Sequence, residues 1–180
     1  MLCQTSNTVF ALVYGKIDPG DLNQTFAMYQ TGFSPAEGST WLGLEAMYAL
    51  TRQGEYRLTI VFNIYSGVKA VYDNFTVNGA VEGYSFTYGH FRADLSDYGD
   101  GFAASVVTGA GSLAGVPFST YDKDPYGCAA QYGTGWWYDD KCGPVLIYAP
   151  ASDRGWWPNS INTLVKFPTM SFKLELMEYY

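Results

Sequence analysis

The chain has 180 residues, of which 48% are hydrophobic and 15% charged, a composition that suits a single globular domain. Its 17 acidic and 10 basic residues give a net charge of −7, and a surface of that sign repels phosphate backbones and anionic lipid. Nucleic-acid binding is therefore disfavoured, and the lack of an apolar run of about eighteen residues argues against membrane insertion.

The first third of the sequence predicts one strand and two short helices. Residues 8–15 are rich in strand-forming residues, and a turn is expected at 18–21. Helical spacing of apolar residues runs from Leu22 to Tyr29 and stops at Gly32. A second helix is expected from Leu44 to Arg52.

The next segment carries the strongest sheet signal. Residues 56–62 alternate between polar and apolar, and 68–77 and 84–88 are rich in strand formers. The Asn78–Gly79 pair is a hairpin-type turn signal. Residues 170–178 alternate again and are expected to return to the central sheet. The fold class is therefore α+β, with a central antiparallel sheet and two short helices.

Residues 93–160 are irregular, and the sequence gives little reason to place catalysis there. The single histidine, His90, has no nucleophile partner that would form a triad, so a structural or merely exposed role is expected. A glycosidase pair could be drawn from four aspartates in solvated loops, where nothing raises one pKa: Asp122, Asp124, Asp139 and Asp140. The glycine-rich stretch 109–115 lacks nucleotide-binding spacing and is expected to be a flexible surface loop.

Cysteines and carboxylates leave several structural questions open. Cys128 and Cys142 lie close in sequence, and a bridge between them would contribute roughly 3 kcal/mol, whereas Cys3 has no obvious mate. Asp122 and Asp124, two residues apart, suit either a calcium loop or a solvated acidic turn. Two glycosylation sequons begin at Asn23 and Asn74 and agree with an oxidising, secretory setting.

The segment from residue 116 to 142 resembles the fibrinogen C-terminal domain, the module shared by fibrinogen chains, ficolins, tachylectins and angiopoietins. The resemblance extends from about residue 8 to the C-terminus. It is carried most specifically by the following residues: Pro117 to Thr120, Asp122, Asp124, Cys128, Ala129, Gly133, Gly135 to Trp137 and Cys142.

The resemblance implies a disulfide between Cys128 and Cys142 and a calcium ion held by Asp122 and Asp124. It also implies a cis peptide bond between Lys141 and Cys142, beside a pocket where backbone N–H groups face the ligand. In lectin-like members of the family that pocket grips acetyl groups on sugars. The expected ligand-binding residues are Tyr132, Tyr138, Lys141, Cys142 and Tyr148, whereas Trp136 and Trp137 are expected in the core.

The sequence also departs from the family pattern. The calcium loop is several residues shorter, so retention and loss of the ion both stay open. Gly143 stands where the lectin-like members have histidine, the stretch 99–115 is extended, and the N-terminal subdomain is largely missing. Cys3 aligns with a cysteine whose partner would precede this chain.

Taken together, the sequence predicts one fibrinogen-like domain over 1–180, secreted and without enzymatic activity. Residues 8–92 with 165–180 would form a sheet and helix subdomain, and 93–164 a loop-rich, disulfide-clipped subdomain that binds calcium and ligand. The leading hypothesis is lectin-like binding of glycans or acetylated ligands near the Cys128–Cys142 loop. The alternative is a protein–protein interaction module, such as a receptor ligand. Oligomerisation would come from segments that this chain does not contain.

Overall fold

The computed structural model describes residues 8–13, 22–34, 40–62, 67–103, 109–143, 145–149, 154–159, 163–167 and 170–177. Its helices are α1 (Phe26–Thr31), α2 (Leu44–Thr51), α3 (Cys128–Tyr132) and the short 3-10 helix η1 (Ala80–Glu82). The strands of the largest sheet are β1 (Thr8–Val13), β2 (Thr40–Trp41), β3 (Tyr56–Phe62), β4 (Val68–Asp73), β7 (His90–Phe91) and β13 (Met170–Leu176). Smaller sheets contain β5 (Thr76–Val77), β6 (Phe86–Thr87), β8 (Phe118–Ser119), β9 (Trp136–Trp137), β10 (Leu146–Ala149), β11 (Arg154–Pro158) and β12 (Leu164–Phe167).

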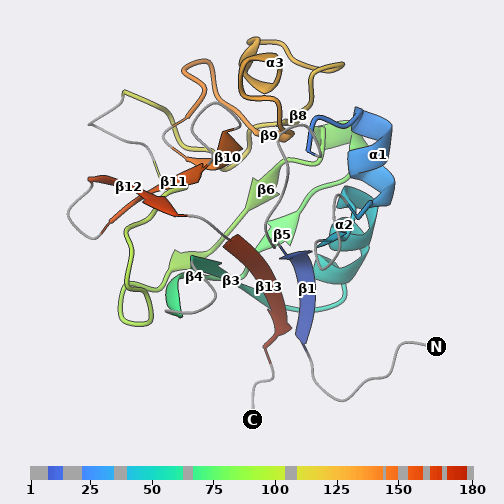
Figure 1. Ribbon diagram of the computed structural model, residues 1–180. Helices are drawn as coiled ribbons and strands as arrows, with labels where there is room; N and C mark the ends of the chain where they lie inside the picture. The colour runs from blue at the N-terminus through green and yellow to red at the C-terminus, as the bar shows by residue number, and fades with distance from the viewer. Residues whose placement is uncertain are drawn as a thin grey trace.

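The largest sheet has the order β2-β1-β13-β3-β4-β7, and its pairings are antiparallel. Figure 1 labels strands β1, β13, β3 and β4 of this sheet. The C-terminal strand β13 lies between β1 and β3, so the predicted return of this segment to the central sheet is confirmed. The structure therefore has the predicted α+β class, with an antiparallel sheet and few helices.

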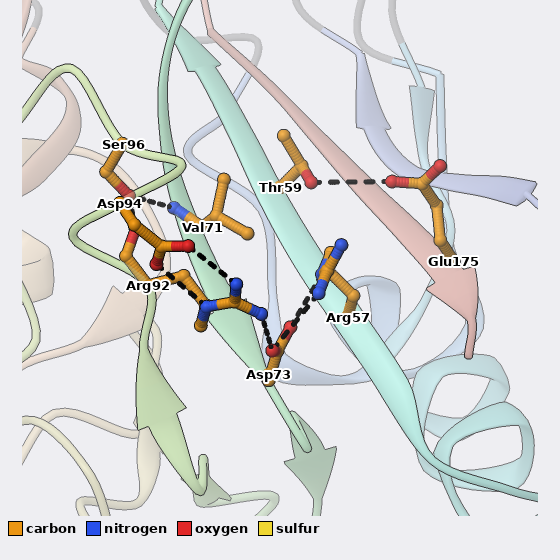
Figure 2. A network of polar contacts seen from close by, with 8 residues as sticks. All are labelled: Arg57, Thr59, Val71, Asp73, Arg92, Asp94, Ser96 and Glu175. Carbon is orange, nitrogen blue, oxygen red and sulfur yellow. Dashed lines mark hydrogen bonds and ion pairs between the residues drawn. The ribbon is translucent and has the colours of Figure 1, made fainter. Parts of the chain in front are cut away.

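Period-two alternation gives the sheet an apolar and a polar face. Leu58, Ile60 and Leu174 are fully buried on the core side. The polar face carries an ion-pair network centred on Asp73, whose carboxylate accepts from Arg57 Nε at 2.6 Å and from Arg92 Nη1 at 2.8 Å (Figure 2). Arg57 belongs to β3, Asp73 to β4, and Arg92 to the segment that follows β7. The network therefore connects β3 and β4 to that segment at the edge of the sheet.

The predicted strand over 68–77 is interrupted in the structure. Asn74 has a left-handed backbone with φ of 55°, which ends β4 and starts the separate strand β5. Strand β5 pairs with β6 rather than extending the main sheet. The Asn78–Gly79 pair is not a two-residue hairpin turn, because η1 intervenes before the chain returns to β6.

Both predicted helices are present, the first with a shifted start and the second with a shifted end. Helix α1 begins at Phe26 because Thr25 caps it, its Oγ1 accepting the Met28 N–H, and it ends at Gly32 with φ of 95°. Leu22, predicted to start this helix, is instead buried in front of it. Helix α2 starts at Leu44 as predicted and ends one residue before Arg52.

Aromatic side chains connect the sheet to the irregular half of the chain. Phe172 of β13 packs on Trp136, with ring centroids 5.6 Å apart, and Phe62 of β3 packs on Trp157 at 4.9 Å. Trp136 and Trp137 are fully buried, which confirms their predicted core role. Among the described residues, no helix is long and apolar enough to cross a bilayer.

Candidate functional site

A disulfide joins Cys128 to Cys142, as the resemblance implied. Cys128 starts α3, directly after a turn over residues 120–127, and Cys142 lies in a second turn over residues 139–143. With Cα atoms 5.3 Å apart, the bridge holds these two turns side by side at the end of the molecule marked by α3 (Figure 1).

Asp139 organises the second turn. Its side chain is 7% exposed; Oδ1 accepts the N–H groups of Lys141 at 3.1 Å and of Gly143 at 2.6 Å. Oδ2 accepts the Gly111 N–H at 2.7 Å, and the Asp139 carbonyl accepts the Cys142 N–H at 3.0 Å. The three consecutive N–H groups of residues 141–143 are therefore all satisfied within the protein.

This arrangement corrects the expectation of a cis bond between Lys141 and Cys142. None of the described residues follows a cis peptide bond. Instead, Cys142 and Gly143 take left-handed conformations, with φ of 61° and 64°. These two residues reverse the chain around the Asp139 carboxylate with trans peptide bonds, so that the N–H groups point inward rather than towards a ligand.

The predicted ligand-binding residues separate into buried and accessible ones. Tyr138 is 1% exposed and its hydroxyl donates to the Thr134 carbonyl at 3.1 Å, so the expectation that it makes an exposed ligand contact is wrong. Burial raises the pKa of the Tyr138 hydroxyl well above its ordinary value. Tyr132 is half-buried and stacks on Tyr138, Lys141 is exposed, and the side chain of Tyr148 lies outside the described residues.

Two tyrosines that sequence reasoning missed are exposed in the first turn. Tyr121 is 45% exposed and Tyr126 is 54% exposed. Both flank the acidic pair in a stretch that also contains Pro125 and Gly127. The sequence did contain a signal for this exposure, namely turn-forming residues next to both tyrosines. Turns lie on the surface and leave large side chains accessible.

The stretch 109–115 is irregular, but it is hydrogen-bonded to the rest of the domain. The Gly111 N–H donates to Asp139, and the Leu113 N–H donates to the Phe102 carbonyl at 2.9 Å. Leu113 is fully buried. The predicted surface loop is thus held in place by the same carboxylate that shapes the second turn.

The calcium ligands expected from the resemblance are already hydrogen-bonded in part. Asp122 Oδ1 accepts the Phe26 N–H at 2.9 Å and the Thr120 hydroxyl at 2.7 Å. Burial alone would raise the pKa of the Asp122 carboxyl, but these hydrogen bonds together hold that pKa below its usual range. Asp124 Oδ2 accepts the Ala130 N–H at 2.8 Å, which ties the turn to α3.

One oxygen of this pair is nevertheless available to a cation. Asp124 Oδ1 is buried and has no hydrogen-bond partner, which is costly for a carboxylate oxygen unless something positive takes it up. Calcium prefers six to eight oxygen ligands, and the described residues bring no third His, Cys, Asp or Glu to this place. The residues present therefore fit a weak site with few side-chain ligands.

Other predicted sites are partly accessible. Asn23 and Asn74, which begin the two sequons, are both exposed, and His90 is exposed in β7. Cys3 and the turn predicted over 18–21 lie outside the described residues. Because the Asp139 carboxylate accepts three backbone N–H groups, its place in the structure is that of a turn-organising residue.

The fold and the disulfide define a class of protein, a fibrinogen-like globe. Residues 4–149 match the family model described as fibrinogen beta and gamma chains, C-terminal globular domain, and the chain belongs to this family. It is similar to a fibrinogen-like protein 1-like protein of Gallus gallus, at 35% identity over 130 residues that cover 69% of this chain and 44% of that protein. It is also similar to Ficolin-3 of Homo sapiens, at 30% identity over 124 residues that cover 66% of this chain and 38% of the relative.

Comparison with solved structures gives the same fold. The lamprey fibrin D-dimer complexed with the peptide ligand Gly-His-Arg-Pro-amide matches with a TM-score of 0.73 and 20% identity, covering 96% of this chain and 62% of that one. The chain spans less than half the length of the curated relatives it matches.

Proposed function

We propose that this chain is a secreted, non-enzymatic recognition domain that binds a protein partner through the two turns joined by the Cys128–Cys142 disulfide. The observation that carries this proposal is the use of the N–H groups of residues 141–143 by Asp139. An acetyl group needs free donors to grip its carbonyl oxygen, and those donors are already engaged here.

Exposed side chains on both turns support a protein partner. Tyr121 and Tyr126 present aromatic rings, and Lys141 presents a charge whose side chain is 59% exposed. Tyrosine is enriched at protein interfaces because it combines a large apolar area with a hydroxyl and loses little conformational entropy on binding. The disulfide pre-organises both turns, which lowers the entropic cost of ordering them on binding.

A panel of secreted and cell-surface ectodomains, presented as immobilised proteins, tests this proposal by surface plasmon resonance. We expect the double variant Tyr121→Ser/Tyr126→Ser to weaken any specific interaction at least about tenfold. Leu95→Ser is the matched control, because Leu95 is also exposed but lies in the turn after β7. An interaction insensitive to the double variant would place the contact elsewhere and contradict the proposal.

Lectin-like binding is the second candidate function. It is favoured by the similarity to Ficolin-3 and by Tyr132, which stacks on buried Tyr138 and keeps part of its ring accessible beside the disulfide. Folded protein would then be retained on an N-acetylglucosamine resin and eluted by the free sugar, and Tyr132→Ala would abolish retention. Retention of this kind without any ectodomain binding would replace the first proposal.

We also propose that Asp122 and Asp124 hold a calcium ion that stabilises the first turn. A metal that binds only the native state stabilises it by about 1.4 kcal/mol at ten times its dissociation constant. The melting temperature with added calcium should therefore be higher than the melting temperature with a chelator, and Asp124→Asn should remove this difference. Asp140→Asn, also an aspartate but in the second turn and 64% exposed, is the control. Equal melting temperatures for the unmodified chain in both solutions would exclude the ion.

A further inference from the structure

A cavity of about 290 Å³ opens between the C-terminal end of α2 and the segment from β5 to η1. Its walls include Tyr48 from the helix, Arg52 from the cap of the helix, and Asn78, Gly79 and Glu82 from the opposite segment. Helix α2 and strand β5 lie away from α3, the helix that starts at Cys128 (Figure 1), so this cavity is separate from the surface proposed above.

The helix side of the cavity offers an aromatic ring and a cation. Arg52 is the C-cap residue of α2 and keeps a right-handed helical backbone, so it lies one turn after Tyr48 on the same side. The Arg52 guanidinium lies over the Tyr48 ring, 5.2 Å from its centroid, and donates a hydrogen bond to the Tyr48 hydroxyl. This contact orients the guanidinium but uses few of its five N–H donors.

The opposite side offers an acceptor of opposite charge. Glu82 is exposed, as is Arg52, and among the residues that the structure describes neither forms an ion pair. The cavity walls therefore carry a group that only donates and a group that only accepts, which do not pair with each other. Asn78, with an amide that does both, lies in the same wall.

Gly79 keeps the cavity open. Its backbone, with φ of −80° and ψ of −176°, is one that any residue can adopt, so the turn itself does not require glycine. A Cβ at this position would lie 3.3 Å from Tyr48 Cζ and 3.5 Å from Glu82 Oε2. The missing side chain thus preserves the space between the ring and the carboxylate.

These walls select a neutral ligand that carries many donors and acceptors. Arg52 would repel a cation and Glu82 an anion, whereas hydroxyl groups can accept from the guanidinium and donate to the carboxylate. The Tyr48 ring provides an apolar surface for C–H groups. The volume is at the small end of ligand pockets, which span roughly 300–1,000 Å³, and suits one ring rather than a chain. We propose that the cavity between α2 and η1 binds a single hexose-type sugar residue.

The experiment is a titration of the folded, oxidised chain with the methyl glycosides of glucose, galactose and mannose, followed by two-dimensional amide NMR. At least one glycoside should shift the amides of residues 48–52 and 76–82 with a dissociation constant in the millimolar range, on the order of 1–20 mM, because so small a site makes few contacts. Shifts confined to residues 128–143, or no shifts with any glycoside up to about 100 mM, would overturn the proposal.

Three variants test the walls one at a time. Gly79→Ala places a methyl group between the Tyr48 ring and the Glu82 carboxylate without changing charge, and should raise the dissociation constant about tenfold or more. Arg52→Gln and Glu82→Gln each remove a charged hydrogen-bonding partner of the sugar. Each should therefore raise the dissociation constant about tenfold or more. Leu95→Ser is again the exposed control and should bind like the unmodified chain.

A zwitterionic peptide is the competing ligand class. Glycylglycine carries both charges and would match Arg52 and Glu82 without any hydroxyl group. Its binding, with the same amide shifts and in the absence of glycoside binding, would overturn the sugar assignment. Amide spectra of each variant report on folding, so a loss of binding with an unchanged spectrum elsewhere is attributable to the cavity.

Discussion

The six-stranded sheet and the disulfide-linked turns are stabilised in different ways. The sheet is held by repeated antiparallel pairing and by an apolar face, so each residue contributes a small share. The turns depend on a few contacts without substitutes, namely the Cys128–Cys142 bridge and the Asp139 carboxylate. Recognition surfaces can therefore be irregular provided that single strong contacts fix them to a regular scaffold.

The largest effect is expected where the two regions meet. Phe172 of β13 packs on Trp136, and Phe172→Ala should lower the free energy of unfolding by about 3–5 kcal/mol, because it leaves a cavity in the shared core. Urea denaturation measures this loss. Lys173→Ala, its neighbour on the polar face, should cost under about 1 kcal/mol. Similar losses for both variants would contradict a core shared by the two regions.

Removal of the disulfide should separate the regions. Cys128→Ser with Cys142→Ser is expected to cost about 3 kcal/mol, because the unfolded chain regains the entropy of an open loop. Amide hydrogen exchange should then accelerate most over 128–143, through local opening, whereas amides of β3 and β13 should accelerate by no more than the loss of global stability accounts for. Equal acceleration in the turns and in the sheet would show that the two regions unfold as one unit.

Alkaline titration tests a buried contact that crosses between α1 and the disulfide-linked half. The Tyr29 hydroxyl donates to the Leu22 carbonyl at 2.8 Å and accepts the Gly135 N–H at 3.0 Å, and burial raises its pKa from 10.0 to about 12. The folded state favours the neutral form of the Tyr29 hydroxyl. The contribution of this group to the free energy of unfolding is therefore fully present below pH 10 and is lost as pH rises to about 12. The loss should reach about 2–3 kcal/mol.

Circular dichroism against pH measures this alkaline loss. Tyr29→Phe should flatten part of the decline between pH 10 and about 12, since it removes one titrating group. Tyr72 and Tyr138, whose pKa values burial also raises, leave the remaining decline. An unchanged alkaline profile in Tyr29→Phe would contradict a special role for this contact.

The smallest effect belongs to the polar face of the sheet. Burial alone would raise the pKa of Asp73, but the bonds from Arg57 and Arg92 outweigh it and lower that pKa. The resulting stability is present above the ordinary carboxyl range and is lost as pH falls through the lowered pKa. Asp73→Asn should cost less than about 1 kcal/mol near pH 7, because solvent screens both arginines.

Acid titration with thermal melting checks this ion-pair effect. The difference between Asp73→Asn and the unmodified chain should shrink as the pH falls from 5 to about 2 and as salt is raised. A difference that stays constant over this range would show that packing, rather than charge, is responsible.

Sequence patterns predicted the regular half well. The alternation over residues 56–62 matches β3, and the run from Leu44 gives α2, because period-two and helical patterns reflect which side chains face the core. The split of residues 68–77 was missed, since nothing local in the pattern reveals that Asn74 adopts a positive φ.

Sequence patterns predicted the disulfide-linked half less completely. Resemblance to the family supplied the cysteine pairing and the buried tryptophans, but it also implied a cis bond before Cys142, and Tyr138 was expected to make an exposed contact. Neither the burial of Tyr138 nor the role of Asp139 follows from neighbouring residues. Both depend on segments distant in sequence, such as the Gly111 backbone that approaches the carboxylate.

By itself, the sequence determined the fold class, the family and the Cys128–Cys142 disulfide of this protein. Apolar periodicity and a specific Cys and Trp motif can both be recognised in short stretches of sequence. Only the tertiary structure decided which donors remain free for a ligand and which tyrosines are accessible. The N–H groups of residues 141–143 point at Asp139, and the walls of the α2 cavity come from separate elements. Free hydrogen-bonding capacity depends on the positions of all neighbours in space, and no stretch of sequence specifies those positions alone.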